Sequence, residues 1–164
     1  MINQLNLYIA LIYMIAAIPY AWLGLYAWRK RPAVAVTPFA WAMLAMSTWA
    51  FMYSLEIFLP TLPTKIFIVK LEYLGITSIP VFLLFFALEF TGKSHLLTLR
   101  TRFMVWGIPI LTLILVWTNE YHHLMWDMET ISITRGIQLL SIRFGFFFGI
   151  HALYSYILLA YTNI

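Results

Sequence analysis

Charged side chains within apolar segments are the residues of this sequence whose types and spacing could do chemistry. Glu56 stands near the end of one apolar segment, and Lys70 and Glu72 stand near the start of the next, across a short proline-containing turn. A charge in an apolar medium is costly unless it is paired, and the tight turn brings Glu56 and Lys70 to similar depth. We therefore predict an ion pair between them. On a helix Glu72 points about 200° away from Lys70, so we expect these two side chains to face different neighbours.

Aromatic and polar residues share the helical faces of these charges. Trp49, Tyr53 and Glu56 have the spacing i, i+4, i+7, and Tyr73 follows Lys70 by about one turn. Such a set can line a small polar-aromatic pocket that opens toward the outer end of the helices. The predicted ligand-binding or structural cluster is Trp49, Tyr53, Glu56, Lys70, Tyr73, Asn119, His122 and His123. The alternative is a structural ion pair that holds two helices in register and binds nothing.

Histidines are the remaining candidate ligands for a metal or cofactor. His122 and His123 are adjacent and diverge by about 100° on a helix, so we predict a polar lip here and no metal site. His151 lies within the last apolar segment, where an imidazole can ligate a haem or a chlorophyll magnesium, and it is the candidate cofactor-binding residue. The alternative for His151 is a hydrogen bond within the bundle. Since His151 has no evident partner ligand on another helix, we predict that the chain carries no cofactor.

Motifs of enzymes and of nucleic-acid binding are missing from the sequence. It has no phosphate-binding loop, Ser/His/Asp arrangement, zinc-ligand spacing or paired catalytic carboxylates. Cysteine is absent, which excludes disulfides and thiolate chemistry. Basic residues stand in the connectors rather than in one stripe, which argues against nucleic-acid binding. We therefore predict that the chain is not an enzyme and binds no nucleic acid.

Five apolar stretches must position the candidate residues. Hydrophobic residues make up 63% of the 164-residue chain and charged residues 10%, with a mean hydropathy of +0.89, which is typical of an integral membrane protein. A bilayer core of roughly 30 Å takes about 20 helical residues, so five spans use nearly the whole chain. We predict an all-α, polytopic transmembrane helical bundle that forms a single domain, 1–164. The spans are expected at about 5–28, 39–59, 66–90, 103–118 and 144–164, with a connector at 119–143 that holds a short interfacial helix or hairpin.

Basic residues in alternate connectors predict the orientation of these spans. One set of connectors carries Arg29, Lys30, Arg31, Lys93, Arg100 and Arg102, and the other carries Lys65, Arg135 and Arg143 together with three acidic residues. Cytoplasmic loops of membrane proteins have an excess of Lys and Arg, so the first set is expected in the cytoplasm. The N-terminus, the 60–65 turn and the 119–143 connector are then expected outside.

The residues singled out above stand within three longer stretches that follow a known pattern. The stretches are WAMLAMSTWAFMYSLE (Trp41 to Glu56), KIFIVKLEYLGITSIPVFLLFFALEFTG (Lys65 to Gly92) and IPILTLILVWTNEYHHLMW (Ile108 to Trp126). Together with His151 and the tyrosines that follow it, this pattern resembles the N-terminal seven-helix sensor region of bacterial membrane histidine kinases. The resemblance covers most of the chain.

The resemblance implies a non-catalytic sensory input module, which senses a small ligand or the state of the membrane and normally feeds cytoplasmic output domains. Counterparts of helices six and seven and of the kinase segments are not found in the sequence, so we expect a truncated form without kinase activity. The alternative function is that of an accessory structural subunit in a larger membrane complex, such as an energy-converting or photosynthetic one. The expected location is the bacterial cytoplasmic (inner) membrane, and the expected partners are the lipid bilayer and other transmembrane helices.

Overall fold

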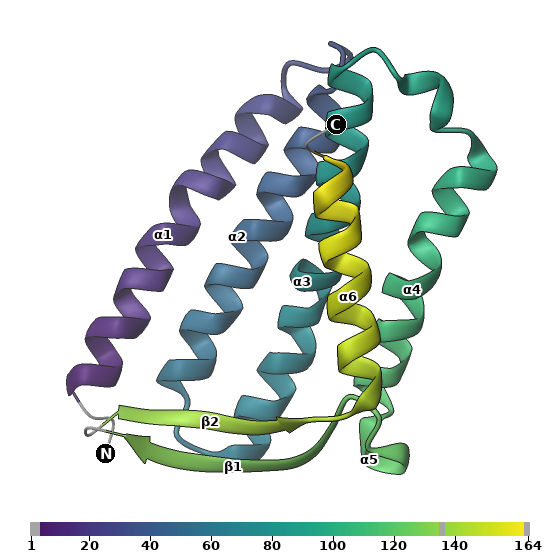
Figure 1. Cartoon of the computed structure of the whole chain (residues 1–164). Helices are drawn as coiled ribbons and strands as arrows, with labels where there is room; N and C mark the ends of the chain where they lie inside the picture. The colour runs from purple at the N-terminus through teal and green to yellow at the C-terminus, as the bar shows by residue number, and fades with distance from the viewer. Residues whose placement is uncertain (1–3, 135–136, 163–164) are drawn as a thin grey trace.

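The computed structural model describes residues 4–134 and 137–162 as a mostly helical chain (Figure 1). Arg135, which the predicted orientation counts, and Ile164, the predicted end of the last span, lie outside the described residues. In chain order the elements are α1 (Gln4–Trp28), α2 (Val36–Phe58), α3 (Leu62–Phe90), the 3-10 turn η1 (Ser94–Leu96), α4 (Leu99–Trp117), α5 (Asn119–His122), β1 (Trp126–Thr134), β2 (Ile137–Phe144) and α6 (Phe146–Tyr161).

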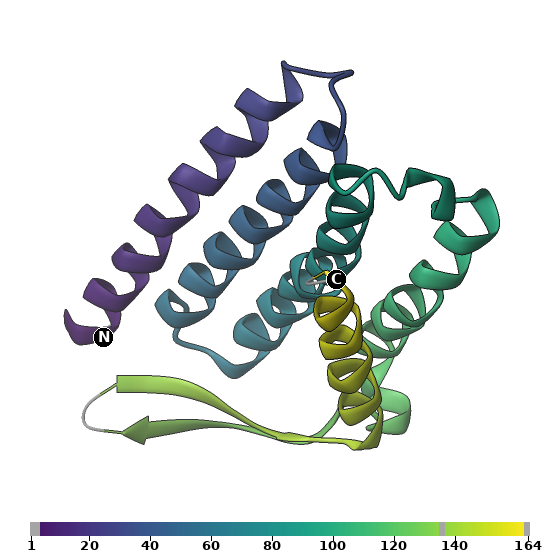
Figure 2. The same ribbon diagram turned by 45° about the horizontal axis from the view of Figure 1, so that its top comes forward.

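Helices α1, α2 and α3 form an antiparallel row, and α4 and α6 pack against α3 and against each other. Strands β1 and β2 lie across the ends of the first three helices, as the tilted view in Figure 2 also shows. We call this end of the bundle, which also holds α5, the hairpin end. The opposite end carries the basic residues of the connectors, and we call it the basic end: Arg29, Lys30, Arg31, Lys93, Arg100 and Arg102.

The fold is not all-α, and this part of the prediction is wrong. β1 and β2 form an antiparallel two-stranded sheet whose register pairs Trp126 with Phe144 and Thr134 with Ile137. Isoleucines alternate with hydroxyl side chains in the first strand, which is the period of a half-buried strand rather than of a helix. The hairpin form expected for the 119–143 connector is confirmed, and it delays the last helix to Phe146.

Three of the helices are long and apolar enough to span a membrane: α1, α3 and α4. α2, with 23 residues, has the length of a span but is not one of these three. The 16 residues of α6 rise only about 24 Å, short of the roughly 30 Å of a bilayer core. Within the described ranges, length and composition therefore define three candidate spans rather than five.

Small residues bring α1 and α2 close together. Ser54 Oγ donates a hydrogen bond to the carbonyl of Ala10 at 2.8 Å, and Ser47 Oγ donates to the carbonyl of Ala17 at 2.9 Å. One further step of seven residues along α1 brings Gly24 against Leu44, whose Cγ would lie 2.8 Å from an added Cβ. Short side chains every two turns thus let the two backbones approach, which is the usual way that helices associate in lipid.

Two clusters of buried side chains hold α3 against the rest of the bundle. The cluster at the hairpin end consists of Val69, Tyr73, Val116, Met125 and Trp126. The cluster nearer the basic end consists of Val81, Leu84, Phe85, Leu97 and Leu158. α3 therefore packs against α2, α4 and α6, and residues on its different faces meet different neighbours.

Asn6 of α1 ties the hairpin to the helices. Its side-chain Nδ2 donates to the carbonyl of Gln138 at 2.8 Å and lies 3.3 Å from the carbonyl of Ile57, while its Oδ1 accepts from the Gln138 N–H at 3.0 Å. Asn6 is only 2% exposed, so water does not readily replace its side chain as a hydrogen-bond partner. The sequence prediction did not single out Asn6.

We expect Asn6→Leu to release the β2 strand from the helices, because the variant leaves the partly buried N–H and carbonyl groups of Gln138 without the Asn6 side chain as a partner. The cost should be about 1–3 kcal/mol in the free energy of closing the hairpin. Amide hydrogen exchange at residues 137–140 measures it, and exchange there should become faster. Gln4→Leu, a change of an exposed residue in the same helix, serves as the control. Unchanged protection of β2 in Asn6→Leu would contradict the role of Asn6.

Candidate ligand pocket

Glu56 forms its ion pair with Lys65, and the predicted pairing with Lys70 is wrong. Lys65 Nζ lies 2.8 Å from Glu56 Oε1 and 2.5 Å from the backbone carbonyl of Glu56. The side chains of Lys65 and Glu56 are 0% and 4% exposed. The turn between α2 and α3 is so short that Lys65, in the first turn of α3, already reaches the depth of Glu56. Sequence reasoning placed Lys65 in a connector and so missed it.

Lys70 pairs with Glu120 of α5 on another side of α3. It stands five residues, or about 7.5 Å of helix rise, beyond Lys65, and its Nζ lies 5.8 Å from the centre of the Trp117 ring. The hydrogen bond from Lys70 lowers the pKa of the Glu120 carboxyl, which favours the ionised form of the pair. Lys70 therefore links α3 to the end of α4 and does not contact α2 through an ion pair.

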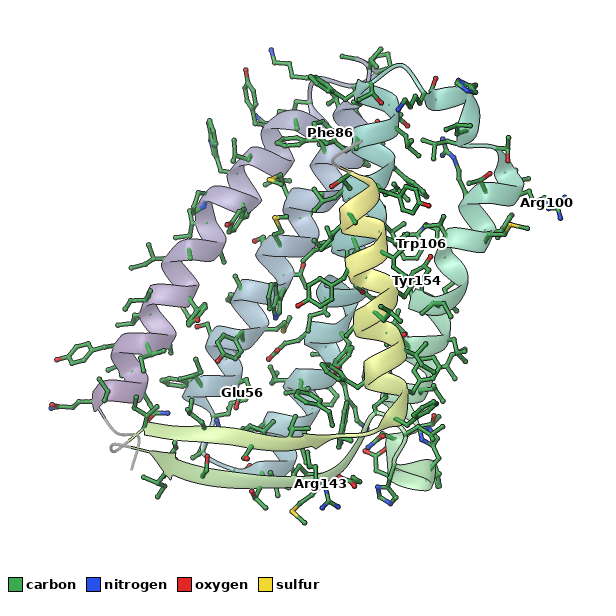
Figure 3. All side chains as sticks on the ribbon, viewed as in Figure 1. Glu56, Phe86, Arg100, Trp106, Arg143 and Tyr154 are labelled. Atoms are coloured by element: carbon green, nitrogen blue, oxygen red, sulfur yellow. The ribbon has the colours of Figure 1, made fainter. Side chains whose placement is uncertain are left out.

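A pocket of about 770 Å³ lies near the hairpin end between α1, α2, α3, β2 and the start of α6. Of the eight predicted cluster residues, four line it: Trp49, Tyr53, Glu56 and Tyr73. The remaining lining residues are Tyr13, Ala16, Tyr20, Met46, Ala50, Val69, Glu72, Ile76, Ile79, Leu140, Ile142, Phe144 and Phe148. Figure 3 shows Glu56 just above the hairpin. Since β2 side chains form part of the wall, the hairpin covers the end at which the prediction expected an opening.

The other predicted cluster residues do not line this pocket. Asn119 is buried and organises the chain before β1: its Oδ1 accepts from the Met125 N–H at 2.9 Å, and its Nδ2 donates to the Trp126 carbonyl at 2.8 Å. His122 Nε2 lies 3.0 Å from Thr118 Oγ1. His123 ends α5 with a left-handed backbone, φ 54°. These residues shape the connector, so the predicted single cluster is divided between two sides of α3.

His151 of α6 is buried at 3% exposure and has a hydrogen-bond partner on α4. Its Nδ1 lies 3.3 Å from Thr112 Oγ1, and Thr112 Oγ1 in turn donates to the Ile108 carbonyl at 2.8 Å. Since the hydroxyl proton of Thr112 is used in that second bond, the neutral His151 is expected to carry its proton on Nδ1. A hydrogen bond within the bundle was one of the two predicted roles of His151; ligation of a cofactor stays a prediction.

Glu72, which the sequence analysis expected to face away from Lys70 but did not include in the predicted cluster, also lines the pocket. It faces the pocket, away from Lys70, and its side chain is 5% exposed. In the part of the chain that the structure describes, no group donates a hydrogen bond to its Oε1. The sequence feature that points to Glu72 is its position: it is a carboxylate within an apolar segment, two residues after Lys70 and on the opposite side of the same helix.

Apolar side chains cover the outside of the bundle, whereas the Glu56–Lys65 pair lies inside. On α1 the exposed residues include Ile12 and Ile15, each 64% exposed, and Ile18 and Trp22, each 62% exposed. A surface of this kind is stable in lipid rather than in water. With three candidate spans, the chain has the features of a multi-pass membrane protein, and it carries a pocket lined by aromatic and carboxylate side chains.

The family model described as the N-terminal 7TM region of histidine kinase matches residues 12–164. The chain therefore belongs to this family, as the sequence resemblance predicted, and the family is that of a sensory membrane module rather than of a catalytic domain. Comparison with curated proteins and with solved structures gives no match.

Proposed function

We propose that this chain is a sensory input module that binds a small apolar or amphipathic ligand in the pocket beside Trp49, Tyr53 and Glu56. The observation that carries the proposal is the pocket itself, a cavity of about 770 Å³ whose wall is mostly apolar and aromatic but includes two carboxylates. Pockets of this size and character are the usual binding sites for small molecules. Membership of a sensory family supports the same interpretation.

The proposed orientation places the hairpin end outside the cell and the basic end in the cytoplasm of a bacterium. Six Lys and Arg residues stand at the basic end, whereas Lys65, Lys70 and Arg143 are the described ones at the hairpin end. All three of these are paired with acidic side chains. The pocket then lies near the exterior, and its occupancy would be transmitted along α2 and α3 to an output domain, such as a kinase, at the basic end.

We expect a neutral bicyclic probe, 1-naphthylmethanol, to bind the pocket and to alter the basic end. Because the natural chain has no cysteine, Ser94→Cys in η1 provides a single site for a long-wavelength environment-sensitive dye. In lipid nanodiscs the dye signal should change saturably with the probe. Ala50→Phe, which adds a ring to the pocket wall, should weaken the apparent affinity by about tenfold or more.

The matched control is Ala160→Phe, the same change at an exposed residue of α6, which should leave the response intact. A response that is absent, or that is equal in Ala50→Phe, would contradict the proposed function. Native mass measurement after gentle extraction tests the alternative. A stoichiometric complex with pigment or quinone proteins would support an accessory subunit and count against a sensor.

A further inference from the structure

We propose that the ligand of this pocket is an organic cation, an amine with an apolar body, whose ammonium group pairs with Glu72. The inference rests on the proposed function of the pocket and specifies the chemical class of its ligand. It follows from the charges in this half of the bundle and from the aromatic rings around them.

Glu72 is a buried carboxyl group at the hairpin end that forms no close ion pair with any of the described residues. Glu56 is paired with Lys65, and Lys70 is paired with Glu120. A carboxylate removed from water is costly unless it is paired and hydrogen-bonded, yet Glu72 Oε1 accepts no hydrogen bond from the described chain. Since Glu72 lines the pocket, a ligand can supply the missing donor and charge.

Among the described residues that line the pocket there is no lysine or arginine, and the polar side chains are carboxylates, tyrosines and one tryptophan. An anionic ligand would therefore meet Glu72 and Glu56 without a free cation to receive it. A neutral apolar ligand would fit the cavity but would leave Glu72 unpaired. A cationic ligand is the class that compensates this site, because it supplies the opposite charge as well as N–H donors.

Aromatic rings line the same pocket as Glu72. Tyrosine and tryptophan side chains of three helices line the pocket: Tyr13, Tyr20, Trp49, Tyr53 and Tyr73. Tyr13 and Tyr53 are already in edge-to-face contact, with ring centres 4.7 Å apart. Faces of such rings attract cations, and aromatic cages recognise ammonium ligands in this way. The aliphatic wall from Val69, Ile76, Leu140 and Ile142 would contact the apolar body of the ligand.

The test compares 1-naphthylmethylamine with 1-naphthylmethanol, which share a ring system and differ in charge. Binding is measured with the labelled Ser94→Cys chain in nanodiscs at neutral pH. We expect the amine to bind at least about tenfold more tightly than the alcohol to the chain with Glu72. Glu72→Gln should remove this preference, because the amide keeps the shape of the side chain without its charge.

Glu89→Gln is the matched control, since Glu89 stands at the other end of α3, 3.9 Å from Arg102, and it should keep the preference for the amine. Glu72→Asp, which retains a carboxylate, should keep part of it. Equal affinities for amine and alcohol, or a preference that persists in Glu72→Gln, would overturn the inference. If the alcohol still responds to Ala50→Phe in that case, the proposed function stands and only the ligand class is wrong. If neither probe binds, the proposed function fails as well.

Discussion

Lys65→Met is expected to destabilise the bundle by about 3–5 kcal/mol, because it leaves the Glu56 carboxylate buried without its counter-ion. Lys65 Nζ contacts both Oε1 and the backbone carbonyl of Glu56, and the Lys65 side chain is completely buried. Removing one partner of a buried pair therefore costs much more than the pair contributes as a whole. The free energy of unfolding, measured by denaturant titration in mixed micelles, should fall by this amount.

A double variant separates the ion pair from the packing of the two side chains. Lys65→Met combined with Glu56→Leu should recover part of the loss, since both charges of this pair are then removed. We expect a coupling energy of about 1–3 kcal/mol between the two sites. Lys93→Met, at a partly exposed lysine of the basic end, is the control and should have little effect. Strictly additive effects would show that Lys65 and Glu56 are not in contact.

Gly75→Leu is expected to destabilise the bundle by about 3 kcal/mol, at the upper end of the usual cost of overpacking. A Cβ at Gly75 would lie 2.6 Å from the Ala45 carbonyl oxygen and 2.9 Å from Trp49 Cβ. The nearest of these atoms belongs to the backbone of α2 and cannot rotate away, so the two helices would have to separate. Denaturant titration measures the loss of stability.

The same substitution at Gly107 provides a matched control. Within the described ranges, no atom beyond its own stretch of helix lies within 4 Å of a Cβ built at Gly107, and the residue is exposed. Replacing a glycine in an exposed helix interior generally favours the helix, so Gly107→Leu should be neutral or slightly stabilising. Equal losses for Gly75→Leu and Gly107→Leu would mean that close packing of α2 on α3 is not what limits the stability.

Helix boundaries were predictable because they depend on local chemistry. Prolines and short polar connectors end the apolar segments close to where the structure ends α1, α2 and α3. α4 begins at Leu99 rather than near Phe103, because the Thr98 side chain accepts a hydrogen bond from the Thr101 N–H and caps an earlier turn. The family was also predictable, because the residues that are typical of it follow one another in the expected order along the sequence.

The candidate site was predictable only in part, because contacts across helices depend on rotation and register. One residue changes the direction of a helical side chain by about 100°, so an error of a few residues assigns a charge to a different neighbour. For this reason the prediction assigned Lys70, instead of Lys65, as the partner of Glu56. The aromatic residues Trp49, Tyr53 and Tyr73 line the pocket. Their helical spacing alone indicates which faces of α2 and α3 they share.

By itself the amino-acid sequence determined that the chain belongs in a membrane, which segments are apolar helices and which family the chain belongs to. These properties follow from composition, segment length and residue order, which act locally. Only the tertiary structure decided that Lys65 neutralises Glu56, that the hairpin covers the pocket and that Glu72 faces the cavity unpaired. These outcomes depend on how closely small residues let the helices approach and on how far each helix is rotated. Both are set by packing between segments distant in the sequence.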